Sequence, residues 1–284
     1  MLTFREALQE TTARLQDAGS TSAGLDATLL LERAAGRDRI HLYSYPTHRL
    51  TEDQYTRFEK LVRRREKGEP MAYILGEREF WGLSFKVTPA VLIPRPDTET
   101  LVEAMLARAA ETQPPIQHLV DLGTGSGAIL LSLLHEWPQA TGLGVDLSEA
   151  ALEVAQENAA QLGLAERARF VQGDWASGLT GPVDMLVSNP PYIETADIDT
   201  LARDVRSYEP RTALDGGPDG LDCYRIIVAQ AAGLVRAGGV LGLEVGHQQA
   251  TALTTMLEEA NQWTDIQIHN DLAGIGRAVS ARRQ

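Results

Sequence analysis

The N-terminal part of the chain repeats apolar residues at the three- and four-residue spacing of amphipathic helices. Such runs begin at Leu2, at Leu25 and, after the potential N-cap Thr51, at Tyr55. No alternating, strand-like run with turn signals interrupts them. Because a bundle is the simplest way to bury several such faces, we predict a small helical bundle over residues 1–75.

Residues 76–94 change from helical spacing to alternation. Phe80-Trp81, Leu83 and Phe85 are arranged around Gly82, a pattern typical of a β-hairpin or a pair of short strands. We expect this segment to link the bundle to the rest of the chain.

From residue 95 to residue 284, short apolar runs alternate with helical stretches. This alternation predicts an α/β domain with a doubly wound, mostly parallel sheet. The segment 263–280 is a candidate for an antiparallel pair at one edge. Strands are expected over 118–123, 141–146, 168–174, 183–190 and 239–245, and helices over 128–136, 148–163 and 221–237.

Composition excludes several classes of protein. The single cysteine, Cys223, rules out a disulfide framework, and no histidine spacing suits a metal, so no metal site is expected. The net charge is −13, of which residues 1–75 carry +1 and the remainder −14. So acidic a chain is a poor candidate for wrapping duplex DNA. Without a membrane-length apolar run or a secretory signal, the expected location is the cytoplasm.

A glycine-rich turn follows the first strand of the α/β region. Residues 121–127 read DLGTGSG, and glycines at alternate positions let a ligand approach the backbone closely. The spacing is not G-x-G-x-x-G, which disfavours a dinucleotide dehydrogenase, and no lysine follows as in a phosphate loop. Asp146 ends the next strand, where an acid suits hydrogen bonds to ribose hydroxyls. The pair predicts a nucleoside site, although each alone also fits an ordinary turn.

Asp174 and Trp175 follow the third strand. An acid there suits the amino group of adenine, and an indole ring can stack on the base. A loop acid beside a packing tryptophan fits the same sequence equally well.

The residues Asn189, Pro190, Pro191 and Tyr192 stand at the carboxyl end of the fourth strand, where ligands bind in open parallel sheets. The two prolines fix an extended backbone, which suits a rigid polar clamp. The side-chain oxygen of Asn189 and the carbonyl of Pro190 are two acceptors for the hydrogens of a planar –NH₂ group. Tyr192 could pack on the plane of that group. The alternative is a proline-rich turn without a ligand.

The order DLGTGSG, Asp146, NPPY resembles the class I S-adenosylmethionine-dependent methyltransferases that act on exocyclic or amide nitrogen. The wider chain resembles one family among them, PrmC/HemK, the N5-glutamine methyltransferases of class I peptide-chain release factors. The chain departs from the family's pattern in the loop NDLAGIGR (270–277), where Asn270 stands in place of the family's arginine. We therefore assign this loop no role. The likeness extends over GEPMAYILGEREFWG (68–82), LIPRPDTE (92–99), SNPPYI (188–193), Glu209-Pro210 and Ala213-Leu214.

The resemblance implies methyl transfer from S-adenosyl-L-methionine to the glutamine amide nitrogen of the GGQ motif. The partners would be class I release factors, with no membrane and no direct nucleic-acid contact, and the resemblance gives the helical bundle of residues 1–75 a role in docking this substrate. Catalytic roles would fall on Asn189, Pro190 and Tyr192, and substrate binding on these together with Pro191, Arg95 and Glu99. Cofactor contacts would come from Gly123, Thr124, Gly125, Ser126, Gly127, Asp146, Asp174, Trp175 and Asn189.

Other functions remain open at this stage. A DNA adenine-N6 methyltransferase, or another protein or amine N-methyltransferase, would use the same acceptors, because NPPY also suits an adenine amino group. A non-catalytic cofactor-binding protein would retain the same sheet. For Arg95 and Glu99, the alternative to a site role is a surface ion pair that anchors the linker.

Overall fold

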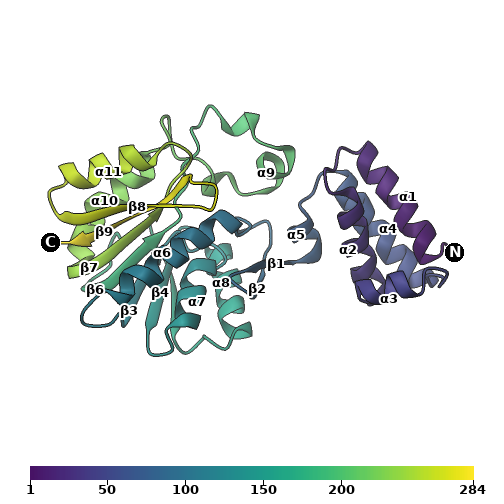
Figure 1. Ribbon diagram of the computed structural model, residues 1–284, viewed down its shortest axis with the longest axis horizontal. Helices are drawn as coiled ribbons and strands as arrows, with labels where there is room; N and C mark the ends of the chain where they lie inside the picture. Colours follow the sequence, from purple (N-terminus) through teal and green to yellow (C-terminus); the bar gives the residue numbers. More distant parts are fainter. The chain divides into compact units, whose positions relative to one another are not determined.

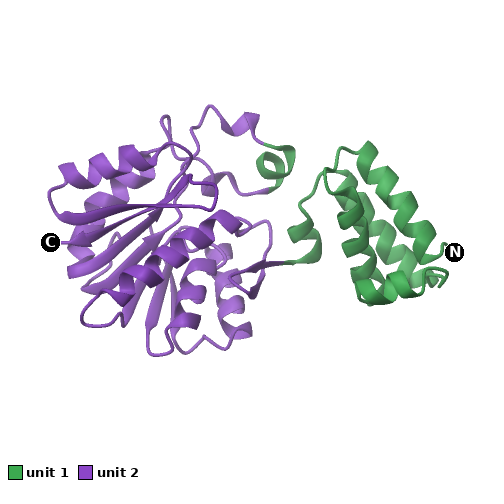
Figure 2. Cartoon of the chain, in the orientation of Figure 1, with its two compact units in different colours: residues 1–77, 202–208 green, residues 78–201, 209–284 purple.

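The computed structural model describes residues 1–284, which divide into two compact units (Figure 2). Unit 1 contains residues 1–77 and 202–208, and unit 2 contains residues 78–201 and 209–284. The chain therefore leaves the larger unit after Leu201 and returns to it at Glu209.

Unit 1 is helical, as the spacing of its apolar residues predicts. Phe4, Leu31 and Phe58 come from three different helices and meet in one buried core. Thr3 and Thr51 cap their helices through reciprocal side-chain and backbone hydrogen bonds. The helices of the first 75 residues are α1 (Phe4–Asp17), α2 (Ala23–Ala35), α3 (Arg39–Ser44), α4 (Glu52–Glu66) and α5 (Met71–Leu75).

A short helix from late in the chain also belongs to unit 1. This helix, α9 (Arg203–Tyr208), is not predicted by the sequence pattern. The Tyr208 hydroxyl donates a hydrogen bond to the carbonyl of Lys67 at 3.0 Å. The Arg203 side chain lies against Gly68. These contacts attach α9 to the segment that follows α4.

The expected pair of short strands is β1 (Glu77–Phe80) and β2 (Leu83–Lys86), which form a two-stranded sheet. Trp81 and Gly82 between them both have positive φ, at 54° and 69°, as the commonest two-residue hairpin turn requires. Phe80 and Phe85 pack edge to face, with ring centroids 6.1 Å apart. Both rings belong to the buried core of unit 2, which anchors the hairpin to it.

Unit 2 is built on a seven-stranded sheet in the order β5-β4-β3-β6-β7-β9-β8 (Figure 1). The first five of these strands are parallel, and β9 pairs antiparallel with both β7 and β8. The mostly parallel sheet and its antiparallel edge pair confirm the predicted fold. The strands are β3 (His118–Leu122), β4 (Thr141–Asp146), β5 (Ala168–Gln172), β6 (Val183–Ser188), β7 (Val235–Glu244), β8 (Trp263–Asn270) and β9 (Gly276–Arg283).

Helices cover both faces of this sheet (Figure 1). Successive residues of β3 show the two sides, because Leu119 belongs to one buried cluster and Val120 to the other. A strand that is buried on both faces reads as the continuous apolar run seen in the sequence. One face carries α6 (Glu99–Ala110), α7 (Ala128–Glu136) and α8 (Glu149–Gln161), and the other carries α10 (Asp222–Leu234) and α11 (Ala250–Glu259).

Several predicted boundaries differ from the structure, most of all the one between α10 and β7. The helix expected to run to residue 237 ends at Leu234, and Val235 already belongs to β7. Val235 is buried and extended and pairs with Val183, so sheet pairing of a β-branched residue overrides the helical pattern. No helix of the structure combines the length and the apolar character needed to cross a membrane.

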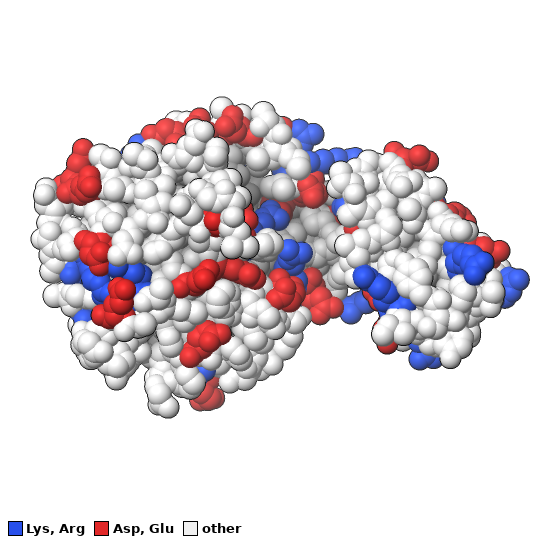
Figure 3. All heavy atoms as spheres, in the orientation of Figure 1, with Lys and Arg blue, Asp and Glu red and all other residues white.

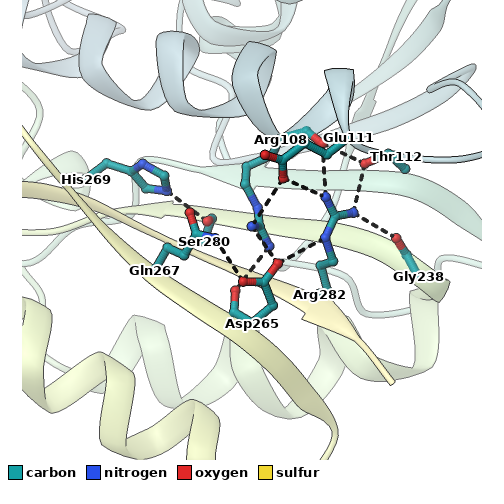
Figure 4. Close-up of polar contacts among 9 residues, drawn as sticks. All are labelled: Arg108, Glu111, Thr112, Gly238, Asp265, Gln267, His269, Ser280 and Arg282. Atoms are coloured by element: carbon teal, nitrogen blue, oxygen red, sulfur yellow. Dashed lines mark hydrogen bonds and ion pairs between the residues drawn. The ribbon is translucent and has the colours of Figure 1, made fainter.

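A nearly buried arginine links the far end of α6 to the edge of the sheet (Figure 4). The Arg108 side chain is 2% exposed, and its Nη1 lies 2.7 Å from Oδ2 of Asp265 on β8. Arg282 on β9 donates to the same carboxylate oxygen at 3.2 Å and to the Thr112 hydroxyl at 2.9 Å. Glu111 lies farther away, at 3.8 Å from Arg108. Asp265 is therefore the main counter-charge of a cation removed from water.

Asp265→Asn should destabilise the protein, because it leaves the buried Arg108 guanidinium without its close counter-charge. Asp265 is partly exposed, so we expect a loss of about 1–2 kcal/mol in the free energy of unfolding. The melting temperature should fall by about 3–6 °C. Thermal unfolding at neutral pH measures this change.

The matched control is Glu111→Gln, which removes an exposed carboxylate from the same cluster and should change the melting temperature little. The pKa of Asp265 is lowered by its hydrogen bonds to Gln267 and Arg108. Its stabilisation is therefore present at neutral pH and lost as the pH falls through the lowered pKa. An equal loss from both substitutions would contradict this assignment.

Candidate active site

The glycine-rich turn joins β3 to α7. Gly123 and Gly125 have φ values of +69° and +55°, which residues with a side chain rarely adopt. The backbone N–H groups of Gly123 and Thr124 donate to the Val145 carbonyl at 2.8 and 3.0 Å. The end of β4 therefore holds the turn in place. The turn lies next to a cavity, which is lined by Gly123, Thr124, Gly125 and Ser126 but not by Gly127.

Asp146, the last residue of β4, adds a second support for this turn. Its Oδ2 accepts a hydrogen bond from the Gly125 N–H, and its Oδ1 accepts one from the Ser148 N–H, both at 2.9 Å. Asp146 also lines the cavity. One carboxylate thus shapes the glycine turn and keeps acceptor capacity for a ligand.

Asp174 and Trp175 lie beyond β5, and both line the same cavity. Trp175 has a φ of +53°, and its ring would lie 3.7 Å from a Cβ at position 123. The next residue, Ala176, donates its N–H to the side chain of Gln230 at 2.8 Å, which fixes the turn. The structure therefore brings the third predicted cluster to the first two.

Asn189 follows β6 and lines the cavity with Pro191. Its Nδ2 donates to the Thr98 hydroxyl oxygen at 3.3 Å. Because the Asn189 nitrogen donates on this side, the Asn189 oxygen is left as an acceptor. This is the polarity that the predicted clamp for an –NH₂ group requires.

Tyr192 and Pro190 are not among the residues that line the cavity. The Tyr192 hydroxyl instead donates to Oε1 of Glu244 at 3.3 Å, behind the cavity wall. The Tyr192 carbonyl accepts a hydrogen bond from Nε2 of Gln249 at 2.9 Å. Burial raises the pKa of Tyr192, so its hydroxyl stays a donor. The expected packing of this ring on a substrate amide therefore stays a prediction.

Arg95 and Glu99 are separated in the structure. Arg95 lines the cavity and forms an ion pair with Glu209, whose buried carboxylate also accepts the N–H of Ile93 at 3.2 Å. Glu99 does not line the cavity, and its carboxylate accepts the N–H of Trp81 in the hairpin turn at 2.9 Å. Arg95 thus lies at the site, whereas Glu99 holds the hairpin to α6.

The cavity has a volume of about 480 Å³, within the usual range for small-molecule sites. Its charged lining consists of two acids, Asp146 and Asp174, and one cation, Arg95. Val91, Ile129 and other apolar residues complete the wall. An acidic, partly apolar cavity suits a ligand with positive charge and a flat apolar group, and it opposes a polyphosphate.

A buried acid lies beneath the glycine turn. Asp121 on β3 is fully buried, and its Oδ2 accepts a hydrogen bond from the Thr124 hydroxyl at 2.7 Å. Its Oδ1 has no hydrogen-bond partner. The pKa of Asp121 is raised to about 7, mainly by burial and to a smaller extent by the nearby Asp146. A perturbed acid beside a cavity is a common feature of functional sites.

Glu244, at the end of β7, is a second acid of this kind. It is 2% exposed, and its Oε2 has no hydrogen-bond partner. Burial raises its pKa to about 7, against the effect of hydrogen bonds from Thr98 and Tyr192. Sequence reasoning missed both Glu244 and Thr98. The available signal was an acid after an apolar strand, the same signal that identified Asp146.

Two domain families match the chain. Residues 6–76 match the family described as PrmC N-terminal domain, and residues 96–205 match the methyltransferase small domain. These matches fall on the helical bundle and on the first part of the α/β sheet.

A solved structure of a T. thermophilus 16S rRNA methyltransferase, in complex with AdoMet and guanosine, has the same fold. The TM-score is 0.53 at 21% sequence identity, over 73% of this chain and 50% of that one. At this identity the likeness concerns the fold alone.

Curated relatives are similar over nearly the whole chain. A release factor glutamine methyltransferase of Bradyrhizobium diazoefficiens is 49% identical, over 95% of this chain and 92% of its own. One from Moorella thermoacetica is 46% identical, over 100% of this chain and 99% of its own. Together with the two domain matches, this similarity means that the chain belongs to the family of release factor glutamine methyltransferases.

Proposed function

We propose that this protein methylates the side-chain amide nitrogen of the glutamine in the Gly-Gly-Gln motif of class I peptide-chain release factors. The methyl donor would be S-adenosyl-L-methionine. The observation that carries the proposal is Asn189, held by Thr98 with its oxygen free, on the wall of a cavity shared with Asp146. The names of the relatives support the same substrate. Because release factors act in translation, the proposal includes a cytoplasmic location.

The residues of the cavity fit this cofactor. The glycine turn brings backbone close to the ligand space, and Asp146 offers acceptors for ribose hydroxyls. Trp175 and Asp174 suit an adenine ring and its amino group. The two acids suit the positive charge of a sulfonium compound, and Arg95 provides the counter-charge for a carboxylate. When bound, S-adenosylmethionine supplies a methyl group that is activated by its sulfonium sulfur.

The work of the protein's own residues is to orient the acceptor nitrogen. An amide nitrogen is a weak nucleophile, because its lone pair is delocalised into the carbonyl. The Asn189 oxygen and the Pro190 carbonyl would accept its two hydrogens and return electron density to the nitrogen. The two prolines keep these acceptors fixed before the substrate arrives, so orientation and preorganised dipoles supply most of the rate.

A second function would use the same geometry. The acceptors also suit the amino group of adenine, so a DNA adenine-N6 methyltransferase would use the same clamp. Such enzymes need a surface that grips DNA phosphates. On the face shown in Figure 3, acidic side chains are spread over unit 2 and basic ones occur in small groups. This distribution favours a protein substrate.

Asn189→Ala should abolish most methyl transfer, because it removes one of the two acceptors for the amide hydrogens. We expect kcat to fall about 100- to 1000-fold and the Kd of the cofactor to change far less. The measurement is incubation with S-adenosylmethionine and a purified Gly-Gly-Gln release factor, followed by mass-spectrometric mapping of the methyl group.

The same factor with its motif glutamine changed to alanine is the substrate control. We expect a single methyl group on the motif glutamine when wild-type enzyme meets wild-type factor. It should be absent with the altered factor and absent with the Asn189→Ala enzyme. Methylation of another residue, or equal transfer by Asn189→Ala, would contradict the proposal.

Asp146→Ala should weaken cofactor binding, because it removes the ribose acceptors and frees the Gly125 N–H. Hydrogen bonds to a charged group contribute about 1.5–3 kcal/mol, so the Kd should rise about 10- to 100-fold. Isothermal titration with S-adenosylmethionine measures it. Asp17→Asn, at an exposed position of α1, is the control and should bind as the wild type does. An unchanged Kd for Asp146→Ala would remove this residue from the site.

A further inference from the structure

A line of buried polar groups runs from the acceptor Asn189 away from the cavity. Asn189 Nδ2 donates to the Thr98 hydroxyl oxygen. The Thr98 side chain also lies close enough to the Glu244 carboxylate to lower the pKa of that group by hydrogen bonding. The Tyr192 hydroxyl donates to Oε1 of the same carboxylate. Glu244 does not line the cavity. Glu244 therefore contacts Tyr192 directly and is connected to Asn189 through the Thr98 hydroxyl, although it does not line the cavity itself.

The hydrogens of this line can be counted. A threonine hydroxyl has one hydrogen to donate, and its oxygen can accept. If Glu244 is ionised, it takes the Thr98 hydrogen, and the Thr98 oxygen is left to accept from Asn189 Nδ2. The Asn189 oxygen then faces the other way, as an acceptor. If Glu244 instead carries a proton and donates it to Thr98, the Thr98 hydrogen is directed at Asn189 and favours the flipped amide.

We propose that Glu244 is a positioning residue of the methyl-transfer site, whose carboxylate fixes the polarity of Asn189 through Thr98 and holds Tyr192 in place. This inference deepens the proposed function and rests on it for its kinetic test. Its structural content, the dependence of the Asn189 amide on the charge of Glu244, can be tested on the protein alone.

The surroundings of Glu244 hold it rigidly. The Tyr224 hydroxyl donates to the backbone carbonyl of Glu244 at 2.9 Å. Gln249 accepts the Gly246 N–H at 3.0 Å while its Nε2 donates to the Tyr192 carbonyl. The end of β7 and the NPPY segment are thus joined by side-chain bridges. These bridges link the backbone around Glu244 to the backbone of Tyr192.

The charged and titratable groups around Glu244 come from several neighbouring elements. Tyr192, Tyr224, Asp97 and Arg277 face it from the neighbouring elements. Arg277 and Asp97 form an ion pair at 2.8 Å, and they act on the pKa of Glu244 in opposite directions: Asp97 raises it and Arg277 lowers it. Burial is the main cause that raises the pKa of Glu244 to about 7.

Glu244→Gln is the direct test, because glutamine has nearly the same shape but presents –NH₂ hydrogens to Thr98. It should favour the flipped Asn189 amide, and we expect kcat to fall about 10- to 100-fold. KM for the release factor, Kd for S-adenosylmethionine and the melting temperature should change little. Glu258→Gln, on the exposed side of α11, is the charge-matched control. An unchanged kcat in Glu244→Gln would overturn the inference.

Thr98 provides a second pair of variants. Thr98→Val removes the hydroxyl at nearly constant shape and should lower kcat as Glu244→Gln does. Thr98→Ser restores the hydroxyl and should recover most of that loss. Equal activities of the valine and serine variants would mean that the hydroxyl does not transmit the effect.

The pH profile separates positioning from a purely structural role. In the wild type, kcat should rise with pH through about 7, as Glu244 loses its proton, and the rise should be absent in Glu244→Gln. Asp121, whose pKa is also raised to about 7, remains in that variant. A rise that persists in Glu244→Gln would assign the profile to Asp121 or another group and would contradict the inference.

A measurement without substrate keeps this test independent of the proposed function. The side-chain amide signals of Asn189, assigned by comparison with Asn189→Ala, can be followed by NMR over the same pH range. They should shift with a midpoint near 7 in the wild type and stay constant in Glu244→Gln. If the wild type methylates no release factor but its signals shift in this way, the proposed function fails and the inference stands. Signals that do not respond to Glu244 would overturn the inference, whatever the activity.

Discussion

The parallel pairing of β3 with β4 on one side and β6 on the other is the constraint on which the candidate site depends. Because the strands are parallel, their carboxyl ends meet at one edge of the sheet, at the point where the strand order reverses. The glycine turn, Asp146 and Asn189 each follow one of these strands. Burial on both faces fixes the register, since a shift of one residue would exchange Leu119 and Val120 between the two cores.

The sheet also supports polar groups that an apolar core would exclude. Asp121 and Glu244 lie at the ends of buried strands, each with one carboxylate oxygen lacking a partner. Leaving such atoms unpaired in the interior costs free energy. In this protein both acids lie directly behind residues that line the cavity, Thr124 and Thr98. The two acids that are costly to bury thus lie next to the residues that would orient a ligand.

Local patterns were sufficient to predict the fold and the part of the cavity lining formed by the glycine turn, Asp146, Asp174, Trp175 and Asn189. The apolar strands, the glycines with positive φ and the acid that ends β4 are all visible along the chain, because each reflects a short-range requirement. The end of α10 was not predictable in this way, since Val235 is drawn into β7 by its pairing with Val183. Thr98 and Glu244 are far from Asn189 in sequence and become its neighbours only through folding. The same holds for Arg95, whose partner Glu209 lies on a distant segment.

The central claim is that the clamp at Asn189 presents acceptors to the amide of a protein glutamine rather than to a base in DNA. A competition assay tests it most directly, with a Gly-Gly-Gln release factor and adenine-containing DNA together in one reaction with labelled S-adenosylmethionine. Our account predicts that the label appears on the release factor, at the motif glutamine, and that adding DNA does not reduce it. Label on adenine, or a release factor that stays unlabelled, would contradict the account.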